Sequence, residues 1–563
     1  MSFHYSALTA TGSDDSLNRK GFIHQDYLDH DANIEDEYAI SVPKDDIDDK
    51  ILLKKQSVKR VFGYPITIPF IISNEFCERF SYYGMRTVLM IYLTKKLMMN
   101  KDDASDWYHE FVALCYATPL LGALIADVFL GKYLTILILS VVYCIGNAIM
   151  ALTAVGMWFP AASNPEGATD IQPQTWGPLL GLQIIALGTG GIKPCVSSFG
   201  GDQFLKSESG RVQRYFSMFY FSINAGSTVA TLLTPELRSS SCMGETTCFP
   251  LAFGVPAFFM VLAVIAFVLA SKWYVKVPPL GNPIVDVAKV SWAMATSKTS
   301  PEELFGAKKV AETKQLFRVL AVFIPFPFFW ALFEQQGSRW IVQAQRLNGQ
   351  LGSITIKPDQ MQVFNPLLIL VMIPVFETVV YPLMKKVGIP TGATFRMVAG
   401  MVLVACSFLI CGFVELGMEE RVAAYNEAHM SSYTLETLPQ EFQLHILTTI
   451  PQIFIITCGE ILCSITGLEF AYAYAPASMK SVCQSFFLLT NAFGNIITII
   501  FTKATKRDLH LYFMWAGIEI AAAIAMFFIT RQVIGPLEKF KLESCQEEAV
   551  KPEDVQMKEV KKK

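Results

Sequence analysis

The chain has 563 residues, of which 52% are hydrophobic and only 17% are charged, and its net charge is −3. A soluble domain usually carries about a quarter charged residues, whereas here the apolar residues gather in runs of about twenty, long enough to cross the hydrocarbon core of a bilayer. The composition therefore excludes a soluble globular protein and gives no reason to expect a nucleic-acid partner. It predicts an all-α polytopic membrane protein.

The first sixty residues contain many Asp, Ser and Tyr and lack hydrophobic periodicity, which predicts a disordered tail over 1–60. The tail ends in the basic stretch KKQSVKR (54–60), which indicates a cytosolic location. The segment DDKILL (48–53) is similar to an acidic di-leucine sorting signal, although so short a pattern arises readily by chance. No cleavable signal peptide precedes the first apolar run, which begins near Pro65.

Twelve apolar runs follow, in two sets of six. The first set lies at about 63–95, 107–130, 133–157, 178–198, 214–235 and 250–272, and the second at about 317–337, 362–384, 394–418, 444–472, 480–502 and 510–531. The pattern predicts a six-helix bundle at 61–272, a cytosolic linker at 273–316, a second bundle at 317–532 with a short extracellular loop at 419–443, and a cytosolic tail at 533–563.

The loop charges orient these helices. With the N-terminus inside, most inner loops and the linker carry Lys and Arg, whereas the outer loop 158–177 has neither and 236–249 has only Arg238. Two outer loops, near 338–361 and 503–509, are also basic, but the balance places both termini in the cytosol. The linker begins with two prolines and continues rich in Lys and Ala, which predicts a turn and then an amphipathic helix on the inner surface.

The first apolar run contains a polar stripe, in the sequence NEFCERFSYYGMR (74–86). Helical spacing puts six of its side chains on one face: Glu75, Glu78, Arg79, Tyr82, Tyr83 and Arg86. Each charge costs about 2.5–3.5 kcal/mol in a spanning helix, so four facing lipid would cost roughly 10–14 kcal/mol. The stripe must face protein or water, either as an ion-pair network that joins helices or as the polar lining of a transport pathway.

The topology also assigns each buried charge a depth. Arg86 lies about 10 Å further out than Arg79 in an outward-running helix, and Glu334 lies about 24 Å above Arg318 in another. Arg86 and Glu334 are therefore expected to meet at an outer gate, and Arg318 and Glu377 at an inner level. Both pairs are either gates that open in turn or permanent structural pairs.

A further set of polar residues is expected at mid-depth. Arg79, Arg86 and Lys193 in one half face Glu460 in the other, an arrangement that suits a zwitterion with a carboxylate at one end and an ammonium at the other. Aromatic side chains provide adaptable apolar pockets around it. The expected peptide-binding residues are Arg79, Arg86, Tyr82, Tyr83, Tyr116, Lys193, Tyr220, Asn224, Trp330, Asn365 and Glu460.

Proton coupling is expected from buried carboxyl groups. Glu75 and Glu78 lie one helical turn apart and are natural proton carriers, with Glu460 in the second half. His109 lies in the sequence WYHEF at a predicted helix mouth, where an unperturbed pKa near 6.5 suits a proton entry switch. A lone His is more often structural, and the residues alone leave that alternative open.

Two short segments have other structural explanations. GTGGIKP (188–194) has the wrong spacing for a phosphate loop and no preceding strand, so it predicts close helix packing followed by a proline kink that exposes Lys193. Most cysteines lie in apolar runs, but Cys242 and Cys248 lie in a polar outer loop, where a disulfide is one of two open alternatives.

Six plus six helices around a basic linker are the pattern of the major facilitator superfamily, in which two bundles rock around a central site. The sequence GALIADVFLGKY (122–133) resembles the inner-loop motif of that superfamily, in which an Asp and a basic residue latch the halves. This resemblance assigns the latch to Asp127 and Lys132.

Longer motifs resemble those of proton-coupled oligopeptide transporters, in particular of the animal branch. They are ExxERFxYYG (75–84), GTGGIKPCVSSFGGDQF (188–204), FYFSINAGS (219–227), FWALFEQQGSRW (329–340) and CGEILCSITGLEF (458–470). The resemblance covers about 65–530 and implies symport of di- and tripeptides with protons. No cofactor is expected, and the expected location is the plasma membrane, with an acidic organelle as the open alternative. It assigns proton coupling and peptide binding to Glu75, Glu78 and Arg79, binding to Lys193, contacts near the peptide amino terminus to Asn224 and Glu460, and proton coupling to His109.

The chain departs from the animal members of that family in one respect. Those members carry a large extracellular domain between helices 9 and 10, and here about 25 polar residues, 419–443, occupy that position. Other functions remain open: a transporter of the same fold for nitrate, histidine or another small solute, or a peptide-sensing receptor without net transport. No catalytic residue or metal ligand is expected, because no intramembrane HExxH or GxSxG elbow is present.

Overall fold

The computed structural model describes residues 53–155, 176–205, 208–278, 283–296, 299–476, 479–502 and 507–560. Most of the predicted tail 1–60 and nearly all of the loop 158–177 lie outside these residues. The regular secondary structure of the described chain is helical apart from two small hairpins, one formed by β1 (Arg60–Val61) and β2 (Tyr64–Pro65) and the other by β3 (Gln350–Leu351) and β4 (Ile354–Thr355).

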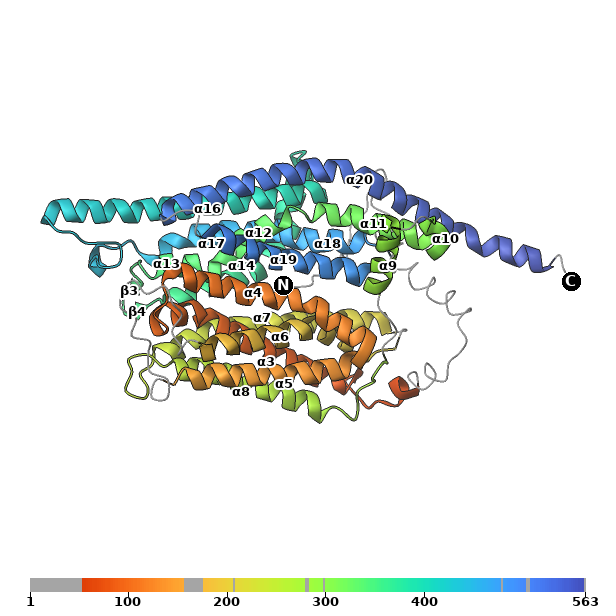
Figure 1. Cartoon of the computed structure of the whole chain (residues 1–563), viewed down its shortest axis with the longest axis horizontal. Coiled ribbons are helices and arrows are strands. Elements are labelled where there is room, and N and C mark those ends of the chain that lie inside the picture. The colour runs from red at the N-terminus through yellow and green to blue at the C-terminus, as the bar shows by residue number, and fades with distance from the viewer. Residues whose placement is uncertain are drawn as a thin grey trace.

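The first half of the chain forms one helical bundle, drawn in orange to yellow-green in the lower part of Figure 1. Its helices are α3 (Thr67–Ile91), continued by the π-helix η2 (Tyr92–Lys96), α4 (Lys101–Leu124), continued by η3 (Ile125–Leu130), α5 (Gly131–Thr153), α6 (Trp176–Gly201), α7 (Ser209–Ser239) and α8 (Phe249–Leu269). A shared core of buried aliphatic and aromatic side chains joins these helices.

Two short helices, α9 (Pro283–Thr296) and α10 (Pro301–Phe305), connect this bundle to the second, upper half in Figure 1. The second bundle consists of α11 (Ala307–Val322), α12 (Phe326–Phe333), η6 (Glu334–Gly337), α13 (Arg339–Ala344), η7 (Pro358–Val363), α14 (Phe364–Val375), η8 (Phe376–Val380), α15 (Tyr381–Lys386), α16 (Ala393–His429), η9 (Gln440–Phe442), η10 (Ile446–Thr449), α17 (Ile450–Glu460), η11 (Ile461–Ile465), α18 (Thr466–Ala473), α19 (Lys480–Thr502) and α20 (Asp508–Val560). A second core holds it together.

The fold is all-α and polytopic, and each of the twelve predicted apolar runs coincides with helical segments. By length and apolarity, eight helices of the described chain could cross a membrane, or nine if the bent pair Ala307–Val322 and Phe326–Ala344 is one span. One of the eight, Lys101–Thr153, contains two predicted runs. Helix α3 is absent from this set because it carries the four charges of the polar stripe.

Three helices extend beyond the apolar runs from which they were predicted. Helix α16 continues to His429, well into the predicted loop 419–443, because the segment GMEERVAAYNEAH favours helix although it is polar. Helix α20 continues through the predicted tail to Val560, and α11 begins at Ala307 inside the predicted linker. Hydropathy locates apolar residues, whereas a helix continues for as long as its backbone hydrogen bonds are favourable.

The predicted close packing of the GTGG segment is confirmed. A Cβ on Gly188 would lie 2.6 Å from Cβ of Tyr143, and one on Gly191 would lie 2.4 Å from a methyl group of Leu139. Helix α6 therefore approaches α5 and α4 more closely than side chains would permit. Pro194 lies inside α6, directly after Lys193.

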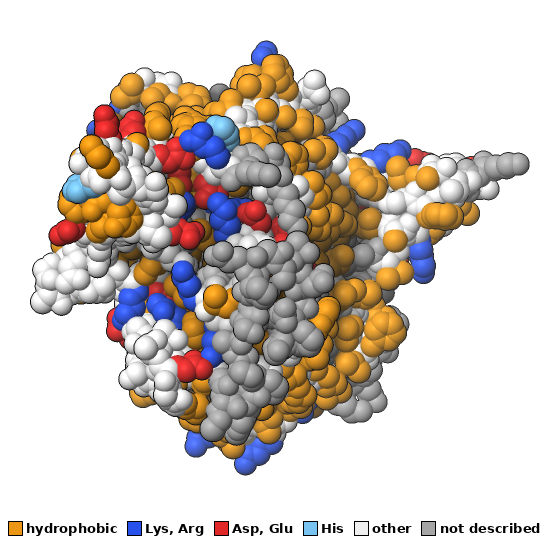
Figure 2. Space-filling model, turned by 60° about the vertical axis from the view of Figure 1, so that its left-hand side comes forward, with side chains coloured by type: hydrophobic (Ala, Val, Ile, Leu, Met, Phe, Trp, Pro, Cys, Tyr) orange, Lys and Arg blue, Asp and Glu red, His pale blue; other side chains and the backbone are white. Residues whose placement is uncertain are grey.

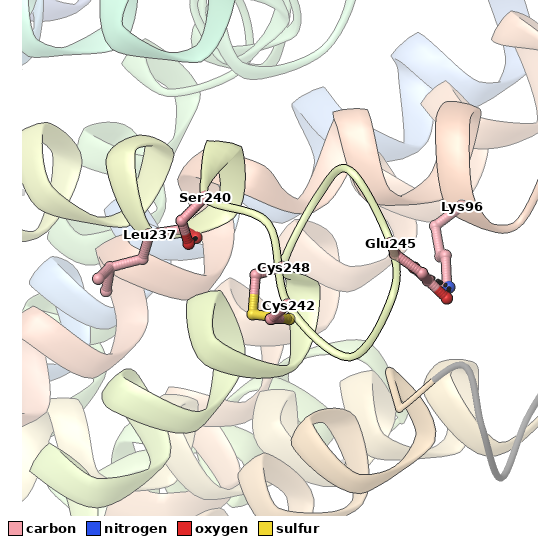
Figure 3. The surroundings of a disulfide bond; sticks show 6 residues. All are labelled: Lys96, Leu237, Ser240, Cys242, Glu245 and Cys248. Atoms are coloured by element: carbon pink, nitrogen blue, oxygen red, sulfur yellow. Dashed lines mark hydrogen bonds and ion pairs between the residues drawn. A yellow bond between two sulfur atoms is a disulfide. The ribbon is translucent and has the colours of Figure 1, made fainter.

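The loop between α7 and α8 contains a disulfide between Cys242 and Cys248 (Figure 3), which decides the alternative that the sequence left open. Within this loop, Cys242 and Glu245 form an isolated antiparallel bridge. The Glu245 carboxylate accepts from Lys96 Nζ at 2.6 Å, so the loop is also tied to the end of η2 (Figure 3). We call this end of the bundles the loop end, and the end that carries α9 and α10 the linker end.

Candidate functional site

The polar stripe of α3 forms a buried charge cluster. Arg79 lies between two carboxylates: its Nε is 3.0 Å from Oε1 of Glu75, and it also forms an ion pair with Glu78. Glu78 Oε1 accepts a hydrogen bond from Thr189 Oγ1 of α6 at 2.8 Å. All three charged side chains are at most 7% exposed, so the two acids and one guanidinium share a site from which bulk water is largely excluded.

Lys193 adds a second cation close to this cluster. Its Nζ lies 4.9 Å from the ring centre of Tyr82 on α3 and 4.1 Å from that of Tyr116 on α4. The ammonium is buried and has no hydrogen-bond partner among the described residues. Two cation–π contacts offset only part of the cost of burying a charge. The arrangement therefore leaves the ammonium available for an anionic group.

The ion pair expected between Arg86 and Glu334 is present, and it joins the two bundles. Arg86 Nε also donates to the Tyr108 hydroxyl at 2.8 Å, and Asn491 Nδ2 of α19 donates to Glu334 Oε1 at 2.8 Å. Gly337 makes this approach possible, because a Cβ at that position would lie 1.7 Å from the Tyr108 oxygen. Any side chain larger than hydrogen at 337 would separate the bundles here.

His109 lies in the same interface, which corrects its predicted place at a helix mouth. Helix α4 begins at Lys101, because the Asn100 side chain caps the backbone N–H groups of residues 102 and 103. His109 is therefore two turns inside the helix and fully buried. Its Nδ1 lies 2.7 Å from Oδ1 of Asn495, and its Nε2 lies 2.8 Å from Oγ of Ser338. Both partners belong to the other bundle, so the imidazole bridges the two halves.

On the opposite side of the interface, Glu460 ends α17 and is followed by the π-helix η11. Glu460 Oε2 accepts a hydrogen bond from Asn365 Nδ2 of α14 at 3.0 Å, and the same amide donates to Thr457 at 3.1 Å. Arg79, Arg86 and Lys193 lie on helices of the first bundle and Glu460 lies on a helix of the second, so the cations and this acid are divided between the two halves as the sequence predicted.

Two other predicted binding residues have different surroundings. Asn224 is 8% exposed, and its amide donates to the Tyr220 carbonyl of its own helix α7 at 2.9 Å. Trp330 is 1% exposed, because its indole packs among Phe329, Phe333 and Phe487 and donates to Thr490 Oγ1. In this structure Trp330 therefore contributes to the core of the second bundle and offers no open surface.

A group of further ion pairs at the loop end was not predicted from the sequence. Arg238 Nε lies 2.8 Å from Oδ2 of the buried Asp359, and Lys357 forms an ion pair with Glu236. The first pair joins α7 to η7 of the other bundle, and the second joins α7 to Lys357, the residue directly before η7. The sequence did contain one signal for such a pair: Arg238 is the single basic residue in the predicted outer loop 236–249.

A second contact at the loop end joins the start of α4 to α13 and α20. Asp102 pairs with Arg339 at 2.6 Å, and Lys101 pairs with Asp508 at 2.8 Å. Figure 2, in which this side of the molecule is turned toward the viewer, shows acidic and basic side chains gathered between the two halves and hydrophobic side chains over the flank. Together with Arg86–Glu334, these contacts close the loop end.

The linker end is arranged differently. Arg318 and Glu377 are both exposed, and the described residues contain no ion pair between them, so the expected inner pair is not formed in this structure. Lys132 lies 2.7 Å from Asp202 at the end of α6, within its own bundle. Of the predicted latch residues, Lys132 is therefore paired inside one half, and Asp127 is not part of this ion pair.

We expect Asp359→Asn to weaken the closure at the loop end. Removing one partner of a buried ion pair costs about 3–5 kcal/mol, and the Arg238–Asp359 pair exists only while the halves touch. The measurement is the distance distribution between spin labels on Ser239 and Gln440, which lie at this end on opposite halves and are exposed. Longer distances should gain population. Glu419→Gln, which removes an exposed pair with Arg507 inside the second half, is the control. An unchanged distribution in Asp359→Asn would refute this assignment.

A model of the POT family matches residues 133–306 and 297–512 of the chain. Human solute carrier family 15 member 1 is 32% identical over 661 aligned positions, which cover 84% of the chain and 93% of the relative. The peptide transporter family 1 protein of Drosophila melanogaster is 47% identical over 378 positions, 64% of the chain and 49% of the relative. In that alignment the chain spans about half of the relative's length.

Solved structures are similar as well. A crystal structure of the POT family transporter PepTSo matches with a TM-score of 0.68 and 30% identity, covering 84% of this chain and 98% of that one. A crystal structure of a proton dependent oligopeptide (POT) family transporter matches with a TM-score of 0.60 and 30% identity, covering 82% and 100%. The sequence comparison and the structure comparison therefore both lead to the POT family.

Proposed function

Because the chain belongs to the POT family, we propose that it is a proton-coupled symporter of di- and tripeptides that works by alternating access of its two bundles. The observation that carries this proposal is the division of buried charge between the halves. Arg79 and the Lys193 ammonium, which has no hydrogen-bond partner among the described residues, lie in one half, and Glu460 lies in the other. A short peptide is a zwitterion, so its carboxylate suits the cations of the first half and its ammonium suits the acid of the second.

Substrate binding then follows from exchange of partners. The peptide carboxylate accepts charge-assisted hydrogen bonds from Lys193 and Arg79. The peptide ammonium donates hydrogen bonds to the Glu460 carboxylate and to the side-chain oxygens of Asn224 and Asn365. The rings of Tyr82, Tyr83, Tyr116 and Tyr220 accommodate side chains of different size. Trp330 would join them only after its indole leaves the core position described above.

We assign proton coupling first to Glu75 and Glu78, which both form ion pairs with Arg79. A proton on Glu75 or Glu78 removes one of the two negative charges beside Arg79 and releases the guanidinium for the peptide carboxylate. His109 links proton uptake to closure, because a second ring proton would disrupt its acceptor role toward one of its two partners across the interface. In the second half, Glu460 either carries a proton or, after losing it, pairs with the peptide ammonium.

Alternating access follows from the two ends of the molecule. Ion pairs close the loop end, including Arg86–Glu334, whereas Arg318 and Glu377 are apart at the linker end. We assign these as gates that form in turn, with Asp127 and Lys132 as part of the linker-end closure in the opposite state.

We place the protein in the plasma membrane with both termini and the linker end in the cytosol. The Cys242–Cys248 disulfide supports this orientation, because disulfides persist in oxidising compartments and the loop end carries this one. The Lys and Arg residues of the linker agree with it.

The test is uptake of a labelled dipeptide into liposomes that contain the purified chain, with an acidic exterior and a negative interior. Accumulation above the external concentration should occur and should collapse when a protonophore is added. Saturable binding without uptake would instead indicate a peptide sensor. Absence of both would refute a peptide substrate and leave a transporter of another small solute.

A further inference from the structure

The linker end of the first bundle contains an open basic cavity that peptide transport does not use. Its volume is about 720 Å³, and its lining includes Arg60, Arg211 and Arg214, with Glu208 as the acidic member. These residues come from the segment before α3, from Glu208 directly before α7, and from the first two turns of α7. Because membrane helices end here, the cavity lies at the level where a bilayer has its headgroups.

The single acid of the cavity is already neutralised. Arg60 Nη2 donates to Glu208 Oε2 at 2.9 Å, and Arg211 also pairs with this carboxylate. Within the described residues Arg214 has no ion pair and no hydrogen bond, and its side chain is exposed. The cavity therefore retains cationic character that no described group of the protein satisfies.

The segment that contributes Arg60 to the cavity also carries two exposed apolar side chains, Phe62 and Leu53. The β1–β2 hairpin turns at Phe62 and Gly63, with φ of 51° and 81°. A bulky residue is uncommon in this left-handed conformation, yet Phe62 is held there with 98% of its surface exposed. Arg60 fixes the hairpin by donating to the Gly63 carbonyl at 3.3 Å while it pairs with Glu208. Earlier in the same segment, Leu53 is 64% exposed.

We propose that this cavity binds the phosphate of an anionic phospholipid headgroup in the cytosolic leaflet, with Phe62 and Leu53 inserted among the acyl chains. Guanidinium groups recognise phosphate oxygens in a bidentate manner, and basic pockets at the cytosolic ends of membrane helices suit anionic headgroups. The inference rests on the orientation proposed above and is independent of the transported solute.

The acidic segment 26–49 of the same chain, which has ten Asp or Glu residues and one Lys, is the competing occupant. Charge alone does not separate the two, because both are anionic. The exposed Phe62 and Leu53 favour lipid, because a bilayer offers a continuous apolar phase directly next to its phosphate layer.

The clamp that shapes the cavity is independent of pH in the cytosolic range. The hydrogen bond from Arg60, aided by Arg211, lowers the pKa of Glu208 to about 2. When the pKa of a carboxyl group is lowered in the folded protein, its ion pair is fully formed at all pH values above the unperturbed pKa. The ion pair is lost only as the pH falls through the lowered pKa. Lipid binding should therefore not change between about pH 6 and pH 8.

The experiment measures calorimetric binding of dihexanoyl phosphatidylserine to the purified full-length chain in detergent. Arg214→Gln should weaken binding about fivefold, since one basic side chain contributes about 1 kcal/mol. Arg531→Gln, an exposed Arg on α20 outside the cavity, should bind as the wild type does. Phe62→Ser should weaken binding of the lipid but not of glycerophosphoserine, which has the same headgroup without acyl chains.

Four results would overturn the proposal: equal lipid binding by wild type and Arg214→Gln, equal binding of dihexanoyl phosphatidylcholine, preference for inorganic phosphate over the lipid, or saturation of the cavity by a synthetic 26–49 peptide with no lipid binding. Dipeptide uptake is measured separately on the same variants. A failure of lipid binding with intact uptake would reject only this inference, and lipid binding without uptake would reject only the peptide substrate.

Discussion

Glu78→Gln should abolish uphill peptide uptake while leaving the protein folded. Glutamine keeps the shape of the side chain and can still accept the hydrogen bond from Thr189 that Glu78 Oε1 receives at 2.8 Å. It cannot take up a proton or form the ion pair with Arg79. Because Arg79 would remain paired with Glu75, the cluster should survive, but proton binding would no longer control the guanidinium. Peptide should then equilibrate across the membrane without accumulating.

The measurement is the accumulation ratio of a labelled dipeptide in liposomes under an inward proton gradient. Glu110→Gln is the matched control: Glu110 is a membrane-helix carboxyl group on α4 that accepts from Gln183 at 3.1 Å and lies outside the polar stripe. The control should accumulate peptide as the wild type does. A wild-type accumulation ratio in Glu78→Gln would contradict its role in coupling.

Glu460→Gln should weaken binding of peptides with a free amino terminus by about tenfold to hundredfold, because a hydrogen bond to a charged group contributes about 1.5–3 kcal/mol. N-acetylated peptides have no ammonium and should lose little. The amide oxygen of glutamine can still accept the hydrogen bond that Asn365 Nδ2 now donates to the Glu460 carboxylate. The effect should therefore report the lost charge and not a rearranged helix.

Competition of each peptide against a labelled dipeptide gives the two affinities. Glu469→Gln provides the control, since Glu469 lies on α18, soon after Glu460, and pairs with Arg396 at 3.2 Å near the linker end. This control should leave the ratio of the two affinities unchanged. If Glu460→Gln weakened both kinds of peptide equally, the assignment of Glu460 to the amino terminus would be rejected.

The sequence alone determined the class of fold and the main features of the central site. Apolar runs of membrane length predicted the helices, because backbone and side chains in a bilayer obey a simple length and polarity requirement. The cost of charge in lipid is enough to direct Glu75, Glu78, Arg79 and Arg86 toward the interior, whichever helices surround them. Helix direction and rise then sufficed to pair Arg86 with Glu334, and this ion pair is present.

The tertiary structure decided which partners each polar side chain has. His109 is fully buried between the halves, Lys132 pairs with Asp202, and Arg238 reaches Asp359 of the other bundle. Periodicity places a side chain on a face of its helix, but it does not tell which residue of another helix lies opposite, because that depends on how two whole bundles meet. The same limit applies to Trp330, whose aromatic neighbours include Phe487 from a helix far along the chain.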